Sequence, residues 1–179
     1  APNKNMLSLL DVKKAKEIVQ ELKSQTDITI VSFHGGAEGT EHVRVPKKTE
    51  IFYGENRGDV HHFARSVVDA GADIVLGHGP HVTRAVEVYK NKFIAYSLGN
   101  FNTYGRFSLT GDKGIAPLLD IKLKSNGDFL SAKVVSVKQT KEKGLELDAE
   151  NRAFQRIKKL TKLDFPEQNL KFEENTIKL

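Results

Sequence analysis

Residues 71–101 read GADIVLGHGPHVTRAVEVYKNKFIAYSLGNF, and this stretch decides the fold. The short apolar run near its start predicts a buried strand that ends at His78. A Gly-Pro turn then brings a second histidine, His81, back toward the same strand end. Farther on, residues 85–89 and 93–98 flank Lys-Asn-Lys and predict a β-hairpin.

A second apolar run, residues 27–33, is rich in β-branched side chains and predicts another buried strand, which ends on His34. Ligands of open α/β sheets bind beyond the carboxyl ends of the strands. Two adjacent parallel strands would therefore bring His34 and His78 together, and the turn would return His81 to the same place. Imidazoles favour Zn, Mn or Fe over Mg or Ca. The pattern predicts a metal site; the alternative is an ordinary hydrogen-bonding role for each histidine in its loop.

Two amphipathic helices accompany these strands. Residues 11–23 carry apolar side chains at helical spacing, and Asp11 is suited to cap the start of this helix. A second helix is predicted from a cap at Asp59 to an end at Gly71.

The other histidines are left out of the predicted metal site. His61 and His62 lie on the second helix, and we expect them to face solvent because other residues already fill its apolar face. His42 lies in residues 37–56, which show no sustained period and predict a surface loop. It contacts substrate or has no role.

The last third of the chain predicts a second hairpin and a closing helix. Residues 118–124 and 129–137 alternate apolar and polar positions around Ser-Asn-Gly-Asp. The helix begins at an Asp148 cap, and the last residues of the chain are expected to be loosely held. Its predicted packed side is formed by Phe154, Ile157, Leu160 and Leu163. The order of elements predicts an α/β fold with a mixed sheet and C-terminal antiparallel hairpins.

Composition excludes several classes of protein. The chain has 179 residues, enough for one domain with a substantial core. Its net charge of +5 comes from interleaved charges, without the basic stripe and stacking aromatics of a nucleic-acid-binding module, so no nucleic acid is expected. It has no cysteine, which excludes disulfides and thiolate metal sites. The first ten residues show neither a signal peptide nor a membrane span, and lack an initiating Met, so the start is expected to be truncated or processed.

Three segments together resemble a known family. Residues 31–39 (VSFHGGAEG), 61–73 (HHFARSVVDAGAD) and 71–101 are similar to the CapA-type poly-γ-glutamate capsule synthesis proteins, a branch of the calcineurin-like metallophosphoesterase superfamily. The likeness runs from about residue 12 to residue 124. It implies a four-layer α/β/β/α sandwich with a centre of two divalent metal ions, Mn, Zn or Fe, that hydrolyses phosphoesters.

The resemblance also implies roles for single residues. His34 matches the histidine of the family's H-x-G-x-E strand end, and His78 and His81 match its G-H-x-P-H loop; all three are implied to be metal ligands and catalytic residues, one of them acting as the acid. Glu38 lies in the same loop as His34 and is a candidate for substrate binding. Asn100, in the SLGNF signature, either caps a turn or contacts substrate.

The sequence departs from the family pattern at two places: at Gly79 in the G-H-x-P-H loop, and in the segment before His34. Some relatives place a second histidine where Gly79 stands here. No Asp-x-His, Gly-Asp or Asn-His motif precedes His34, so the histidines alone would give an incomplete centre. We therefore expect residues 1–140 to be the C-terminal half of a CapA-type domain and residues 141–179 to be a C-terminal helix and tail.

The expected partners and location follow from the same resemblance. The partners are the missing N-terminal half, or the polypeptide that carries it, and an anionic polymer or phosphoester substrate; membrane association would come only through segments outside the sequence. The expected location is the extracytoplasmic side of the cell envelope, with the cytoplasm as the alternative. Three functions stay open: a metal-dependent phosphoesterase, a non-catalytic envelope component that binds an anionic polymer, and a fragment with neither activity.

Overall fold

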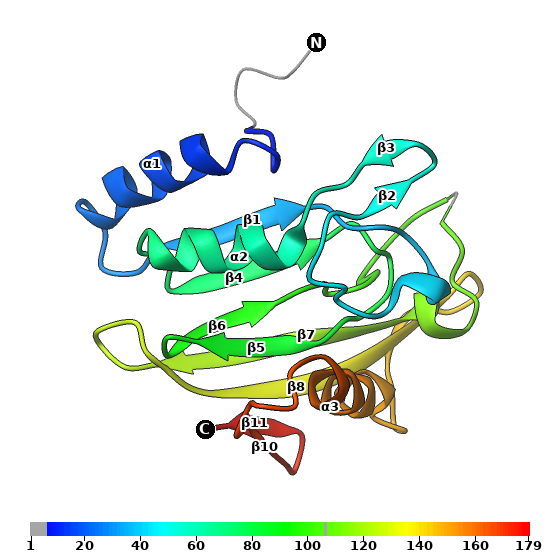
Figure 1. The fold of residues 1–179 in the computed structure, drawn as a ribbon. Helices are drawn as coiled ribbons and strands as arrows, with labels where there is room; N and C mark the ends of the chain where they lie inside the picture. Colours follow the sequence, from blue (N-terminus) through cyan, green and yellow to red (C-terminus); the bar gives the residue numbers. More distant parts are fainter. Residues whose placement is uncertain (1–6, 106) are drawn as a thin grey trace.

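The computed structural model describes residues 7–105 and 107–179 (Figure 1). The expectation of a truncated or processed start falls largely on residues 1–6, which lie outside the described residues. The first part of the chain forms, in order, α1 (Val12–Lys23), β1 (Ile30–His34), α2 (Val60–Asp69), β4 (Ile74–His78), β5 (Val86–Tyr89) and β6 (Lys92–Ala95).

The first sheet has the strand order β1-β4-β6-β5. β1 and β4 are parallel, with Ile30 opposite Ile74 and His34 opposite His78, and β6 is parallel to β4. β5 and β6 form the predicted antiparallel hairpin. Its turn residues Lys90 and Asn91 both have positive φ, the geometry of the tight hairpin turns that match strand twist.

Both predicted helix starts are confirmed. The side chain of Asp11 accepts a hydrogen bond from the backbone N–H of Lys14 at 3.0 Å, and Asp59 accepts one from that of His62 at 2.8 Å. The end of α2 comes earlier than predicted, because Ala70 is its C-cap and Gly71 follows with φ 120°.

Two cores lie on the two faces of the first sheet. The first is between the sheet and the pair α1 and α2, and the second is between the sheet, a second sheet and α3 (Arg152–Asp164) (Figure 1). The second core is built by residues from five strands and the helix: Ile74, Val86, Val88, Phe93, Ala95, Phe129, Ala132, Val134, Phe154, Ile157 and Ile177.

The second sheet is antiparallel throughout. It consists of β7 (Ile115–Leu123), β8 (Phe129–Thr140), β9 (Gly144–Leu147), β10 (Lys171–Glu173) and β11 (Thr176–Lys178). β8 pairs with β7 as predicted, and also with β9 and β11. The expectation of a loosely held tail is therefore wrong, because β11 adds to the sheet and Ile177 is fully buried.

The closing helix α3 begins later than predicted. Its N-cap is Asn151. Asp148 accepts a hydrogen bond from the backbone N–H of Arg152 at 2.8 Å, and forms an ion pair with the guanidinium of the same residue. Three of its four predicted packing positions are buried, but Leu163 is 49% exposed, so that part of the prediction is wrong.

The predicted surface loop 37–56 is partly structured. It contains a short 3₁₀ turn (Thr40–His42) and a small hairpin of β2 (Ile51–Phe52) and β3 (Glu55–Asn56). The α/β class, the mixed sheet and the C-terminal antiparallel hairpins are confirmed. No helix in residues 7–105 or 107–179 is long and apolar enough to cross a membrane.

Candidate metal centre and the groove beside it

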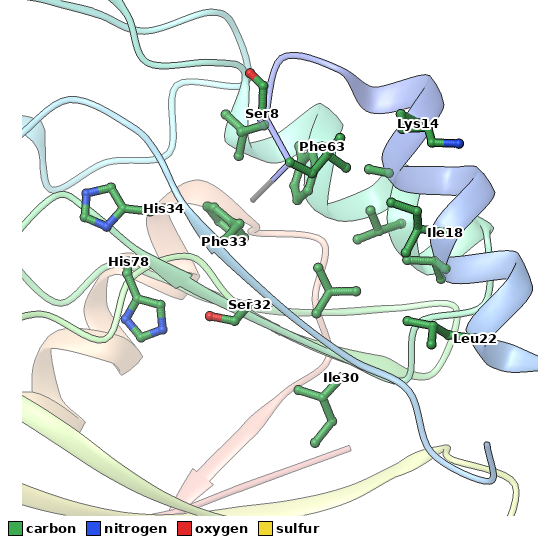
Figure 2. A pocket seen from close by; sticks show the side chains of 16 residues that line it. Ser8, Lys14, Ile18, Leu22, Ile30, Ser32, Phe33, His34, Phe63 and His78 are labelled. Atoms are coloured by element: carbon green, nitrogen blue, oxygen red, sulfur yellow. The ribbon is translucent and has the colours of Figure 1, made fainter. Parts of the chain in front are cut away.

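The carboxyl ends of β1 and β4 bring two histidines side by side. His34 and His78 are the last residues of these parallel strands and stand opposite each other in the register. The His34 side chain is exposed and that of His78 is half-buried. The predicted juxtaposition of these two imidazoles at one sheet edge is confirmed (Figure 2).

The loops that follow the two strands are joined by backbone hydrogen bonds. The N–H of Gly35 donates to the carbonyl of His78 at 2.8 Å, and that of Gly39 donates to the carbonyl of Pro80 at 2.9 Å. A Cβ at Gly79 would come within 2.6 Å of the carbonyl oxygen of Gly35. A histidine at that position would therefore need a shift of the loop backbone.

His81 is fixed by its backbone and by a buried amide. Its φ of 57° is unusual for a residue other than glycine. Nδ1 lies 2.8 Å from Oδ1 of Asn100, and Nε2 lies 3.7 Å from Oε2 of Glu38. The ring of Phe107 lies beside the imidazole, with ring centroids 5.0 Å apart. His81 and Glu38 are therefore neighbours, which the spacing of the sequence motifs does not reveal.

Glu38 is held by an arginine that the sequence analysis missed. Nη2 of Arg57 donates to Oε1 of Glu38 at 2.5 Å, and its Nε donates to the carbonyl of Gly36 at 3.4 Å. Arg57 lies 19 residues beyond Glu38, after the small hairpin of the 37–56 segment, and no motif in the sequence marks it.

A buried ion pair between Arg84 and Glu50 holds the segment 37–56 in place. Arg84 is fully buried and donates to both carboxylate oxygens of Glu50, at 2.9 and 2.7 Å. It also donates to the carbonyl oxygens of Ala37 and His42, and Glu50 accepts from the N–H of Ala37. A charged residue inside an apolar stretch was the sequence signal for this pair, because such a residue needs a buried partner.

The electrostatics of the strand ends favour neutral imidazoles. Partial burial lowers the pKa of His34, and the cationic Arg57 lowers it further. Partial burial likewise lowers the pKa of His78, with His34 as the second cause. Both rings are therefore mainly neutral at pH 7, the form that binds metal ions.

The donor atoms fit a metal in kind but not in number. Neutral imidazoles and a carboxylate are suitable ligands for Zn, Mn or Fe. Within residues 7–105 and 107–179, however, no three His, Cys, Asp or Glu side chains are grouped so that they could hold one ion. The histidines of this chain by themselves do not form a complete metal centre.

The remaining histidines lie elsewhere. The His61 ring packs against both Tyr96 and Phe165, at centroid distances of 6.1 and 6.0 Å, and its Nε2 is buried without a partner within the described residues. The prediction that His61 faces solvent is therefore wrong, because its ring fills the space where α2 meets the end of α3. His62 is exposed as predicted, and His42 packs on the ring of Phe52.

An apolar groove of about 1030 Å³ runs along β1 and ends at the histidines. Figure 2 shows His34 and His78 at one end, and Ile18 and Leu22 of α1 toward the other. Side chains from both faces of β1 line the groove, since successive residues of a strand point to opposite sides. The groove therefore follows the free edge of β1.

Comparison with known proteins identifies the family of this chain. The profile of the family described as "Bacterial capsule synthesis protein PGA_cap" matches residues 1–104, which include both histidine loops. The chain belongs to this family. The resemblance to CapA-type proteins that the three sequence motifs predict is thereby confirmed.

Two relatives are matched over only part of their length. The chain is 36% identical to the PGA biosynthesis protein CapA of Bacillus subtilis (strain 168) over 111 residues, which cover 62% of the chain and 25% of the relative. It is 34% identical to the capsule biosynthesis protein CapA of Bacillus anthracis over 119 residues, which cover 66% of the chain and 24% of the relative. The matched region thus spans about a quarter of each relative.

Proposed function

We propose that this chain carries the histidine ligands of a divalent-metal centre in a CapA-type protein, and that the completed centre hydrolyses phosphoesters. The observation that supports the proposal is the pairing of His34 and His78 at adjacent strand ends, with His81 in the loop after β4, which is hydrogen-bonded to the loop after β1. Both strand-end rings have lowered pKa values, and therefore offer lone pairs at neutral pH.

The residues have separate tasks in this proposal. His34, His78 and His81 would hold ions such as Mn, Zn or Fe, two in the complete domain, and one of the three rings would protonate the leaving group. The metal would supply Lewis acidity and an activated water. Glu38, oriented by Arg57, would contact the bound substrate or its water. Asn100 is only 4% exposed, and its amide N–H groups face backbone carbonyls, which favours a structural role over substrate contact.

The rest of the domain would complete the site. We infer that the missing ligands come from the part of a CapA-type protein outside the matched quarter, and that this part adds to the open edge of β1 to give the four-layer sandwich. The apolar groove along β1 supports this arrangement, because it leads directly to His34 and His78. The names of the relatives support a role in poly-γ-glutamate capsule synthesis at the cell envelope.

The test uses the full-length protein that contains this chain. The protein is purified in the presence of Mn or Zn. Bound metal is then measured by mass spectrometry, and phosphoesterase turnover is measured with an aryl phosphate. His78→Ala and His81→Ala are expected to lose metal and turnover together. His62→Ala, which changes an exposed histidine on α2, is the matched control and should keep both. Unchanged metal content in His78→Ala and His81→Ala would contradict the proposal.

A second candidate is a non-catalytic envelope component that binds an anionic polymer. The net charge of +5 favours it, because a basic surface attracts a polyanion. An occupied metal site without turnover, together with salt-sensitive binding of poly-γ-glutamate, would support this candidate over the enzyme.

A further inference from the structure

The buried amide of Asn100 has only one consistent orientation. Its Nδ2 lies 3.0 Å from the carbonyl oxygen of Lys113 and 3.4 Å from that of His81. Carbonyl oxygens only accept hydrogen bonds, so the NH₂ group must face them. The amide oxygen Oδ1 therefore faces the imidazole of His81, from which it lies 2.8 Å away.

This orientation determines which ring nitrogen of His81 carries a proton. An amide oxygen is an acceptor, so Nδ1 of His81 must be the donor. In the neutral ring the proton then sits on Nδ1, and Nε2 keeps its lone pair. We propose that Asn100 is a positioning residue that holds His81 in this Nδ1–H tautomer.

The other side of the ring shows why the tautomer matters. Nε2 of His81 lies 3.7 Å from Oε2 of Glu38, too far for a hydrogen bond. Arg57 donates to the other oxygen of Glu38. Two acceptors, the lone pair of Nε2 and the carboxylate oxygen, thus face each other across a gap, where a cation would contact both.

The tautomer of His81 and its contact with a metal rest on different observations. That Nε2 serves as a metal ligand rests on the proposed function, whereas the tautomer itself follows from the contacts of Asn100. In metal sites a ligating histidine commonly donates its second ring N–H to a fixed acceptor, which sets the ring orientation. Asn100 would provide that acceptor, and its place in a buried turn would keep it from moving.

The tautomer is measured directly in the metal-free chain. Histidine labelled with ¹⁵N is followed by long-range ¹H–¹⁵N correlation at pH 8.5, where an ordinary histidine is neutral, and the signals of His81 are assigned by their loss in His81→Gln. We expect a protonated Nδ1 and an unprotonated Nε2. A protonated Nε2, or a ring that carries both protons at this pH, would overturn the proposal.

Two variants separate tautomer control from a merely structural role. Asn100→Leu removes the acceptor, and the Nδ1–H signature should be lost in favour of a mixture with Nε2–H. Asn100→Asp keeps an acceptor in place, and should keep the signature. Asn102→Leu, at an exposed position of the same loop, should leave the spectrum of His81 unchanged. Retention of the Nδ1–H signature in a folded Asn100→Leu protein would show that Asn100 does not set it.

Folding is checked by circular dichroism. Should Asn100→Leu fail to fold, the smaller Asn100→Ala removes the same acceptor and is measured in its place, and retention of the Nδ1–H signature there would overturn the proposal. In the full-length protein, Asn100→Leu is expected to weaken metal binding about 10–100-fold. A wild-type Nδ1–H signature in a full-length protein that binds no metal would leave this inference intact and contradict the proposed function.

Discussion

The two edges of the first sheet are treated in opposite ways. At the β5 edge, the hydroxyl of Thr161 in α3 accepts from the N–H of Val86 at 3.1 Å and donates to its carbonyl at 3.2 Å. Farther along, the side chain of Gln168 accepts from the N–H of Val88 at 2.9 Å. A helix and the segment after it thus occupy the backbone groups that a further strand would use.

The β1 edge has no such cover among the described residues. β1 is an edge strand of its sheet, Ile30 is 57% exposed, and an apolar groove follows the strand. Of the candidate metal ligands, His34 ends this edge strand and His78 ends its neighbour β4, and neither lies on the sealed strand β5. The contrast teaches that α3 and the segment after it cover one edge of the sheet, whereas the other edge borders the groove that ends at His34 and His78.

The largest expected effect on stability comes from the buried ion pair that holds residues 37–56, the segment that follows β1. Arg84→Met leaves the Glu50 carboxylate buried without its two strongest donors, and loosens the loop that carries Glu38. We expect a loss of about 3–5 kcal/mol in the free energy of unfolding, measured by urea denaturation. Lys90→Met, which removes one half of an exposed pair with Asp69, is the control and should cost no more than about 1 kcal/mol. Equal losses in the two variants would contradict a structural role for the buried pair.

The next largest effect on stability is expected where α3 covers the β5 edge. Thr161→Val keeps the shape of the side chain but leaves the buried N–H and carbonyl groups of Val86 without partners. The expected loss is about 1–3 kcal/mol in the same denaturation experiment. Thr110→Val, at an exposed position outside the sheets, should change the stability by less than about 0.5 kcal/mol. A neutral Thr161→Val would mean that the helix covers the edge without sealing it.

A smaller effect concerns pH at the sealed side, where His61 packs on Phe165 just after α3. Burial lowers the pKa of His61, Arg65 and Lys47 lower it further, and Glu87 opposes them. The unfolded state therefore binds more protons, so this contribution to stability is complete above the unfolded pKa of about 6.5 and is lost as pH falls.

The measurement is the slope of unfolding free energy between pH 7 and pH 5. His61→Phe keeps an aromatic ring in the stack, and should make the slope shallower than in the wild type. His62→Phe, one residue along α2 and exposed, is the matched control. An unchanged slope in His61→Phe would locate the pH dependence in other groups, such as His34 and His78, whose pKa values are lowered as well.

The smallest effect on the isolated chain is the sharpest test of the open edge. Ile30→Lys changes an exposed side chain, and should alter the stability of this chain by less than about 0.5 kcal/mol. If the rest of a CapA-type protein covers β1, the same change in the full-length protein should cost about 1.5–3 kcal/mol, because Ile30 is then buried. Denaturation of both proteins gives the comparison. Equal small effects would indicate that the edge stays open in the complete protein.

Much of the framework could be predicted from short stretches of sequence. The apolar periods of α1, α2, β1 and β4 set these elements, since each period reports which face of a local segment is buried. The strand ends placed His34 and His78 opposite each other, and the Gly-Pro turn placed His81 in the loop that follows β4. The partners of those histidines could not be predicted, because no local pattern states that Asn100 accepts from His81 or that Arg57 holds Glu38.

The sequence by itself determined the helices, the strands and the histidines at their ends, because these depend on side-chain periodicity and turn chemistry within a few residues. The tertiary structure alone decided that α3 seals β5, that β11 joins β8, that the His61 ring packs on Tyr96 and Phe165, and that Arg84 pairs with Glu50. These contacts join segments far apart in the chain, so their free energy comes from groups that no short stretch contains.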